Sequence, residues 1–290
     1  MSMSTGMFYF VSDLHGRERR YSRLFEAIRD ERPRAVFIGG DLFPASIRGG
    51  TDGNRVSHAF LEEYLIPEIS SVRRTADSPT EFFVIPGNDD PRVYEELFLT
   101  AAREGVWNYI HNRRVQWNST HVFGYAYVPP SPFRLKDWER YDVSRYVPPG
   151  CVAPEDGIHT TDVPEYDVLH RTIADDLADV TGEVSCGNDI WLMHTPPYET
   201  ALDRIDTRGR SIDHVPLDTH VGSIAVRRAI EKKQPLVTLH GHIHESSRLS
   251  GSWQERIGRT CCFTAAYDGP ELALVRFTVD DIASAERELL

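Results

Sequence analysis

The sequence predicts an α/β fold built on a mostly parallel β-sheet. Short apolar runs alternate with amphipathic helical stretches through the first third of the chain, and this strand, helix, strand order gives right-handed crossovers and parallel pairing. The 290 residues are 40% hydrophobic and 26% charged. These values exclude the disordered, collagen-like and coiled-coil classes, and the length allows a sizeable core.

The first half of the chain shows the alternation most clearly. Residues 7–11 are almost all apolar, as expected of a strand buried on both faces. A helix follows at 19–31, and Pro33 ends it. Asp90 is expected to cap a later helix that has Pro91 at its first position. The other elements predicted here are strands at 35–38 and 82–85 and helices at 56–72 and 91–103.

A segment from about residue 128 to 187 differs in kind from the rest of the chain. It is rich in proline and aromatic residues and has one helical stretch, near 172–180. A structureless loop of this length is improbable inside a compact domain, so we predict a single domain, 1–290, with an inserted cap or arm at 128–187. The pattern otherwise continues with strands at 121–125, 190–193, 236–239, 260–265 and 272–279 and a helix at 223–233.

The insertion allows three interpretations. Its aromatic residues, among them Phe133, Trp138, Tyr141 and Tyr146, could form a satellite core, a lid over a substrate, or a contact between two copies of the chain. We favour a satellite core with some lid function, and a homo-oligomer formed through the insertion remains open.

Composition restricts the partners and the location. The net charge of −12 argues against broad binding of nucleic acid, so an anionic substrate needs a local positive centre. No run of eighteen apolar residues predicts a membrane span. The four cysteines include no CxxC pair, and the first strand begins too near the N-terminus for a signal peptide. We therefore expect a cytoplasmic protein with reduced thiols and no membrane partner.

Polar residues with metal-ligand chemistry follow five of the predicted strands, at the edge where open α/β sheets place their sites. Imidazole, carboxylate and amide groups without thiolate favour Mn²⁺, Fe²⁺ or Zn²⁺. Their number exceeds the needs of one ion and suits two ions that share a carboxylate. The seven candidate ligands are Asp13, His15, Asp41, Asn88, His194, His242 and His244.

The chain resembles the calcineurin-like metallophosphoesterase superfamily in the order of five motifs: Asp13-x-His15, Gly40-Asp41, Gly87-Asn88, His194 and Gly241-His242-x-His244. Apart from the insertion, the resemblance covers residues 7–245. It implies a four-layer α-β-β-α sandwich, in which two packed mixed β-sheets are flanked by helices. It also implies two divalent ions, with a hydroxide between them as the nucleophile. The implied ligands are Asp13, His15 and His244 for one ion and Asn88, His194 and His242 for the other, with Asp41 as the bridge.

One position departs from the family pattern, since Asp89 stands where a histidine usually follows Gly-Asn. The resemblance is therefore to a bacterial-type form with Gly-Asn-Asp, and the transition-state role usually given to that histidine is in doubt. A carboxylate beside two dications has a lowered pKa and is a poor general acid. It also repels the dianion of a phosphate monoester more than the monoanion of a diester. We expect a preference for phosphodiesters.

Other residues are candidates for substrate contacts. His220 could deliver the proton in place of the missing histidine, and Arg17, Arg208 and Arg210 could hold phosphate oxygens. A solvated loop is the simpler interpretation of the segment between His194 and Ser223, and a surface salt bridge is an equally good interpretation of Arg17.

The function that these observations predict is hydrolysis of a small phosphodiester at a two-metal centre. Two alternatives use the same centre, a phosphomonoesterase and a nucleotide pyrophosphatase. A non-catalytic scaffold on the same fold is a rival from another class, although such a protein would be expected to lose metal ligands. An acidic chain without a basic groove disfavours a DNA nuclease.

Overall fold

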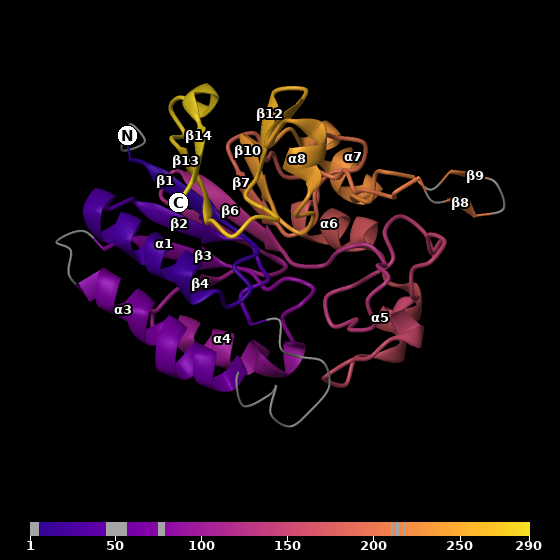
Figure 1. Ribbon diagram of the computed structural model, residues 1–290, viewed down its shortest axis with the longest axis horizontal. Helices are drawn as coiled ribbons and strands as arrows, with labels where there is room; N and C mark the ends of the chain where they lie inside the picture. The colour runs from indigo at the N-terminus through magenta and orange to yellow at the C-terminus, as the bar shows by residue number, and fades with distance from the viewer. Residues whose placement is uncertain (1–5, 45–56, 75–78, 210, 213–214, 217) are drawn as a thin grey trace.

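Two six-stranded mixed sheets lie face to face in the computed structural model, with helices on the outer sides (Figure 1). The structure describes residues 6–44, 57–74, 79–209, 211–212, 215–216 and 218–290. The predicted helix at 56–72 falls partly outside these ranges, at residue 56. No helix in the described ranges is long and apolar enough to cross a membrane.

The first sheet has the strand order β14-β13-β1-β2-β3-β4. The four strands β1 to β4 run parallel, whereas β13 and β14 are antiparallel additions at one edge. Their bounds are β1 (Phe8–Val11), β2 (Ala35–Ile38), β3 (Glu81–Val84), β4 (Asn108–Tyr109), β13 (Ala273–Phe277) and β14 (Glu286–Leu289). The C-terminal ends of β1, β2 and β3 therefore meet at one edge of this sheet.

The second sheet has the order β11-β12-β10-β7-β6-β5. Four central strands are parallel and the two edge strands are antiparallel. The bounds are β5 (Arg113–Trp117), β6 (Thr120–Tyr125), β7 (Ile190–Met193), β10 (Val237–His240), β11 (Gln254–Ile257) and β12 (Thr260–Thr264). A separate hairpin of β8 (Ser211–Ile212) and β9 (Val215–Pro216) extends from the loop after β7 (Figure 1).

The helices begin and end where local signals place them. At the end of the first helix Arg32 is left-handed, directly before Pro33. The Ser223 hydroxyl accepts the Val226 amide at the start of α7, and Thr172 forms a capping box at the start of α6. The bounds are α1 (Glu18–Glu31), α3 (Ile66–Arg74), α4 (Glu95–Arg103), α5 (Glu165–His170), α6 (Ile173–Thr181), α7 (Ile224–Lys233) and α8 (Ser246–Ser250), with a π-helical turn (Phe60–Leu65) before α3 and 3₁₀ turns at Arg92–Tyr94, Pro154–Asp156 and Ile282–Ser284.

Buried side chains along each strand point alternately to the two faces of its sheet, and this alternation produces four layers. In β1, Phe8 and Phe10 point into the core between the sheets, while Tyr9 and Val11 pack beneath α1, α3 and α4. In β7, Ile190 and Leu192 enter the same central core, whereas Trp191 and Met193 pack with residues of α6 and α7. The α-β-β-α arrangement implied by the family resemblance is confirmed.

Two local predictions differ from the structure. The expected helix at 91–103 begins as a 3₁₀ turn at Arg92–Tyr94 and becomes α-helical only at Glu95. The insertion contains a second helix, α5, besides the one expected near 172–180. Its buried residue Trp138 shares one core with Tyr125 and Trp191 of the second sheet, so this aromatic residue belongs to the core of that sheet.

We predict that Phe37→Ala lowers the free energy of unfolding by about 3–5 kcal/mol. Phe37 is fully buried between the sheets and stacks on Phe83 with a centroid distance of 5.2 Å, so truncation leaves a cavity in the layer that joins them. Chemical denaturation measures the loss. Val184→Ala, at an exposed site, should change stability by less than about 0.5 kcal/mol. A similar loss in both variants would contradict this account of the core.

Candidate metal centre

Backbone hydrogen bonds bring four loops together at the C-terminal edges of the two sheets. The amides of Asp13 and His15, after β1, donate to the carbonyls of Gly40 and Asp41, after β2, over 3.0 and 2.8 Å. The Gly241 amide, after β10, donates to the His194 carbonyl, after β7, over 2.9 Å. The two pairs of loops meet where the His242 amide donates to the Asp13 carboxylate at 3.0 Å.

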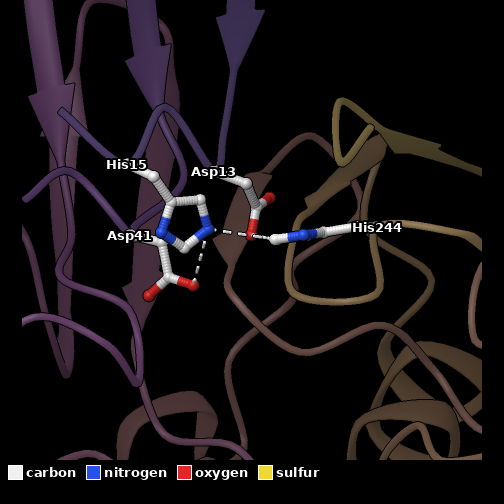
Figure 2. A group of neighbouring side chains, drawn as sticks. All are labelled: Asp13, His15, Asp41 and His244. Carbon is white, nitrogen blue, oxygen red and sulfur yellow. Dashed lines mark hydrogen bonds and ion pairs between the residues drawn. The ribbon is translucent and has the colours of Figure 1, made fainter. Parts of the chain in front are cut away.

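Four of the predicted ligands form one compact group. Asp13, His15, Asp41 and His244 each present a ligand atom, and these atoms all lie within 4.8 Å of one another (Figure 2). The Nε2 atom of His244 lies 3.1 Å from Asp13 Oδ1 and 3.1 Å from His15 Nε2. His15 Nε2 is also 3.6 Å from Asp41 Oδ2. Two carboxylates and two imidazoles thus converge on one point.

The chemistry of this group fits a divalent cation. Asp13 and Asp41 are 0% and 2% exposed, and two buried carboxylates so close together need a compensating charge. Burial raises the pKa of Asp13, but the hydrogen bond and charge of His244, together with the charge of His194, outweigh burial and hold that pKa at about 2. Burial lowers the pKa of His15, which favours a neutral imidazole, and its buried Nδ1 has no hydrogen-bond partner in the part of the chain that the structure describes. The carboxylate of Asp13 and the neutral imidazole of His15 are the forms that bind a metal ion. The hydrogen bond to Asp13 outweighs burial and raises the pKa of His244, so a metal ion would displace a proton from that ring.

A second set of donors adjoins the first. His194 Nδ1 lies 2.7 Å from the Gly39 carbonyl, an arrangement that orients the ring and leaves Nε2 toward the site. His194 Nε2 lies 3.0 Å from Asn88 Oδ1, and the His194 and His242 rings are 5.3 Å apart. Burial lowers the pKa of His242 to about 3. Asn88, His194 and His242 therefore come together, as the motif order predicted.

Asp41 lies between the two sets. Its Oδ2 atom is 3.6 Å from His15 Nε2 and 3.5 Å from His194 Nε2. Its Oδ1 atom accepts the Asp89 amide at 2.9 Å, which fixes the carboxylate orientation. Burial alone lowers the pKa of His194, but the Asp41 carboxylate outweighs burial and raises it to about 10. One oxygen of Asp41 thus faces a histidine from each set.

Several of these residues occupy a strained backbone conformation. Asp13, His15, Asp41 and His242 have φ values of 57°, 48°, 54° and 72°, in the left-handed region that costs non-glycine residues about 1–3 kcal/mol each. The buried Arg20 helps to hold one of them, because its Nη1 atom donates to the Asp13 carbonyl at 2.6 Å. Strain of this kind at converging polar groups is typical of a functional site.

Two supporting residues were not predicted from the sequence. Arg20 lies on α1 and also donates to the Gly269 carbonyl, a contact for which no sequence motif exists. Asp90 was expected to cap a helix, and this prediction is wrong. Its carboxylate instead accepts the amides of Leu42, Phe43 and Gly87 at 2.8–3.0 Å, and so joins the loops after β2 and β3.

Two other predicted site residues, Asp89 and Arg17, lie outside the two donor sets. The Asp89 carboxylate is 44% exposed and lies 3.8 Å from His15 Nδ1. The carboxylate of Asp41 raises the pKa of Asp89, whereas bound divalent ions would act in the opposite direction. Arg17 donates to the Gly269 carbonyl at 3.1 Å. This backbone contact is neither the phosphate contact nor the surface salt bridge that the sequence left open for Arg17.

His220 and Arg208 contact none of the seven candidate ligands among the described residues. His220 Nδ1 lies 2.7 Å from Asp203 Oδ1. Arg208 is exposed, and its amide donates to the Asp206 side chain. Arg210 lies outside the described residues. The catalytic and substrate-binding roles suggested for these residues stay predictions.

Together the two mixed sheets and the converging Asp, His and Asn side chains define a phosphoesterase-type metal centre. The family model for the calcineurin-like phosphoesterases matches residues 6–246, and the chain belongs to that family. No curated protein matches the sequence.

Solved structures share the fold at low sequence identity. Protein TT1561 of Thermus thermophilus is 14% identical, with a TM-score of 0.53 and 99% of each chain covered. A dimetal phosphatase from Danio rerio is 12% identical, with a TM-score of 0.53, over 94% of this chain and 92% of the other. At these identities the likeness concerns the fold.

We predict that Gly87→Ala abolishes tight metal binding. A Cβ atom at Gly87 would lie 2.2 Å from Asp41 Oδ1 and 2.7 Å from His194 Cε1, so both side chains must move. Gly105→Ala is the control, because its φ of +75° is strained but nothing lies within 4 Å of the added atom. Gly105→Ala should cost about 1–2 kcal/mol of stability and keep its metal. Equal metal content in both purified variants would contradict the prediction.

Proposed function

We propose that this phosphoesterase uses two divalent ions and hydrolyses a small phosphodiester. The observation that carries the proposal is the position of Asp41, whose Oδ2 faces His15 of one donor set and His194 of the other. A single ion would leave one of these sets without a role. A carboxylate between two sets of imidazole and oxygen donors is what a shared ligand of two ions requires.

In this proposal each donor set holds one ion. Asp13, His15 and His244 form the first set, Asn88, His194 and His242 the second, and Asp41 belongs to both. When bound, the two ions would supply a hydroxide nucleophile from water and offset the charge of the phosphate. The protein holds the candidate ligands in fixed orientations. The Gly39 carbonyl lies 2.7 Å from His194 Nδ1 and orients that ring, and the His242 amide donates to the Asp13 carboxylate at 3.0 Å.

The proposed preference for diesters rests on Asp89. Its half-exposed carboxylate lies 3.8 Å from His15 and accepts a hydrogen bond from Asn88 at 3.1 Å, so it lies at the open side of the donor sets. A third carboxylate at this position adds repulsion toward the second charge of a monoester. On the same basis we propose that the chain belongs to a bacterial-type subgroup of the family, which has Gly-Asn-Asp at this motif.

His220 is the proposed proton donor to the leaving oxygen. Asp203 is fully buried, accepts the amides of Thr200 and Gly222, and lies 2.7 Å from His220 Nδ1. An imidazole held at Nδ1 by a carboxylate has a fixed tautomer and a free Nε2. Arg17, Arg208 and Arg210 are proposed to contact the phosphate or its substituents.

The partners and location follow from charge and cysteine chemistry. A net charge of −12 supports a small phosphate ester rather than nucleic acid as the substrate. Four unpaired cysteines support a reducing, cytoplasmic location. Exposed aromatic residues of the insertion, Phe133, Tyr146 and Tyr166, support a homo-oligomer contact through that segment.

We predict that purified protein loaded with Mn²⁺ hydrolyses an aryl phosphodiester with a higher kcat/KM than the matched aryl monoester, and that chelation removes both activities. Re-addition of Mn²⁺, Fe²⁺ or Zn²⁺ in turn identifies the most effective ion. Asp89→Asn removes the charge at nearly constant size. It should raise the monoester to diester ratio by roughly fivefold, corresponding to about 1 kcal/mol of charge repulsion at a solvated site.

Other outcomes separate the alternatives. A higher kcat/KM for the monoester would favour the phosphomonoesterase, and release of a nucleoside monophosphate from a dinucleotide pyrophosphate would favour the pyrophosphatase. Metal binding without turnover of any of these esters would favour the scaffold protein.

We predict that His220→Asn lowers kcat for esters with poor leaving groups by about 100-fold, which is the usual contribution of a positioned general acid. Esters with good leaving groups, which need little protonation, should be almost unaffected. Metal content should stay at the wild-type value, because His220 contacts no candidate ligand among the described residues. An equal loss for both kinds of ester would exclude His220 as the proton donor.

A further inference from the structure

The insertion contacts the loop that carries Asn88 through residues Asp137–Asp142, which we call the brace. The indole N–H of Trp138 donates to the Asp90 carbonyl at 2.6 Å, and the Asp137 carboxylate accepts the Arg92 amide at 2.8 Å. Trp138 and Asp137 are each 1% exposed, so both contacts are shielded from water. These two hydrogen bonds with the insertion therefore fix the turn that begins at Gly87 and contains Asn88.

The other end of the brace contacts the loop that carries His194. The Asp142 carboxylate accepts the Ser223 hydroxyl and the Ile224 amide, the latter at 2.7 Å. Ser223 in turn exchanges backbone hydrogen bonds with the loop after β7: its amide donates to Pro196 at 2.9 Å and its carbonyl accepts from Tyr198 at 3.0 Å. Pro196 is two residues beyond His194.

The two loops belong to different sheets, yet their side chains must meet closely. Asn88 follows β3 of the first sheet and His194 follows β7 of the second, and Asn88 Oδ1 lies 3.0 Å from His194 Nε2. The brace itself is fixed to the end of β6, since the backbone of Val128 pairs with Trp138 and Arg140 at 2.9 and 3.0 Å. The Trp138 indole therefore ties a loop of the first sheet to a segment fixed on the second.

We propose that the brace sets the distance between Asn88 and His194, and through it the affinity of their donor set for a divalent ion. Trp138 is a positioning residue in this proposal, which rests on the proposed two-ion function. Loss of its N–H leaves the Asp90 carbonyl without this donor in a buried place and releases the turn that carries Asn88. The donor set of Asp13, His15 and His244 lies on the loops after β1 and β10 and does not contact the brace among the described residues.

The test is a Mn²⁺ titration of the Trp138→Phe protein, with bound ions counted by calorimetry and by the spin signal of free Mn²⁺. The wild type should bind two ions. The variant should bind one ion with unchanged affinity and the other about 10- to 100-fold more weakly, as found when groups that orient metal ligands are removed. Excess Mn²⁺ should restore its kcat, which a general loss of folding would not allow.

Tyr141→Phe is the matched control. It removes a hydrogen bond from the same segment, but the Tyr141 hydroxyl donates to Glu155 within the insertion, at 2.8 Å. This variant should bind both ions like the wild type, with thermal unfolding recorded for both proteins. If Trp138→Phe does not fold, Asp142→Asn tests the other end of the brace, and the same weakening of one ion is expected.

Three results would overturn the proposal: two ions bound by Trp138→Phe with wild-type affinity, equal weakening of both ions, or the same weakening in Tyr141→Phe. Failure of the wild type to bind two ions would instead reject the two-ion function, and this inference with it. The wild-type titration thus distinguishes the two failures.

Discussion

The buried carboxylate of Asp41 is the group on which the rest of the site depends. It is 2% exposed, and burying it without compensation would cost several kcal/mol. Burial raises the pKa of Asp41, but the nearby imidazole of His194, aided by that of His15, holds it well below its usual range. Gly40 and Gly87 carry no side chains, which leaves room for Asp41 and His194 to approach each other. The two histidines that stabilise the buried Asp41 carboxylate belong to different donor sets. The Oδ2 atom of Asp41 therefore faces both sets.

The geometry of the centre is strained, and the two-sheet core stabilises it. Four candidate ligands in left-handed backbone conformations together cost several kcal/mol, a large fraction of the net stability of an ordinary domain. Short apolar strands buried on both faces supply the stabilising free energy, because the central core contains bulky side chains from both sheets, such as Phe10, Phe37 and Leu192. The ligands also follow these strands directly, so the rigid core fixes the positions from which the strained loops depart.

The sequence predicts those parts of the molecule that depend on local signals. The bounds of β1, β2 and α1 are predicted within a residue or so, because continuous apolar runs and helical spacing depend on few residues. The convergence of the candidate ligands within each sheet is also predictable, since parallel strands end at a common edge. The meeting of the ligand edges of the two sheets was implied only by the family resemblance, because β1, β2 and β3 belong to one sheet and β7 and β10 to the other. Asp90 shows the limit: a good local capping position was outweighed by three amide donors, two of them 47 and 48 residues away. The contacts of Arg20 with Gly269 and of Trp138 with Asp90 also join remote residues, 249 and 48 positions apart. Short edge strands such as β11 lack a buried pattern.

The position of the insertion explains how it can influence the metal centre without disturbing either sheet. It connects β6 to β7, which are parallel neighbours, and such a pair always needs a crossover connection. Helix α6 fulfils that role, because Ile173 and Leu177 pack with Trp191 on the outer face of the second sheet. The segment before α6 is thus an extension of an obligatory crossover, and it leaves β6 at the edge where the ligands of both sheets meet. A segment that leaves one sheet at this edge can reach the loops of the other sheet, as Trp138 does 13 residues after the end of β6 at Tyr125.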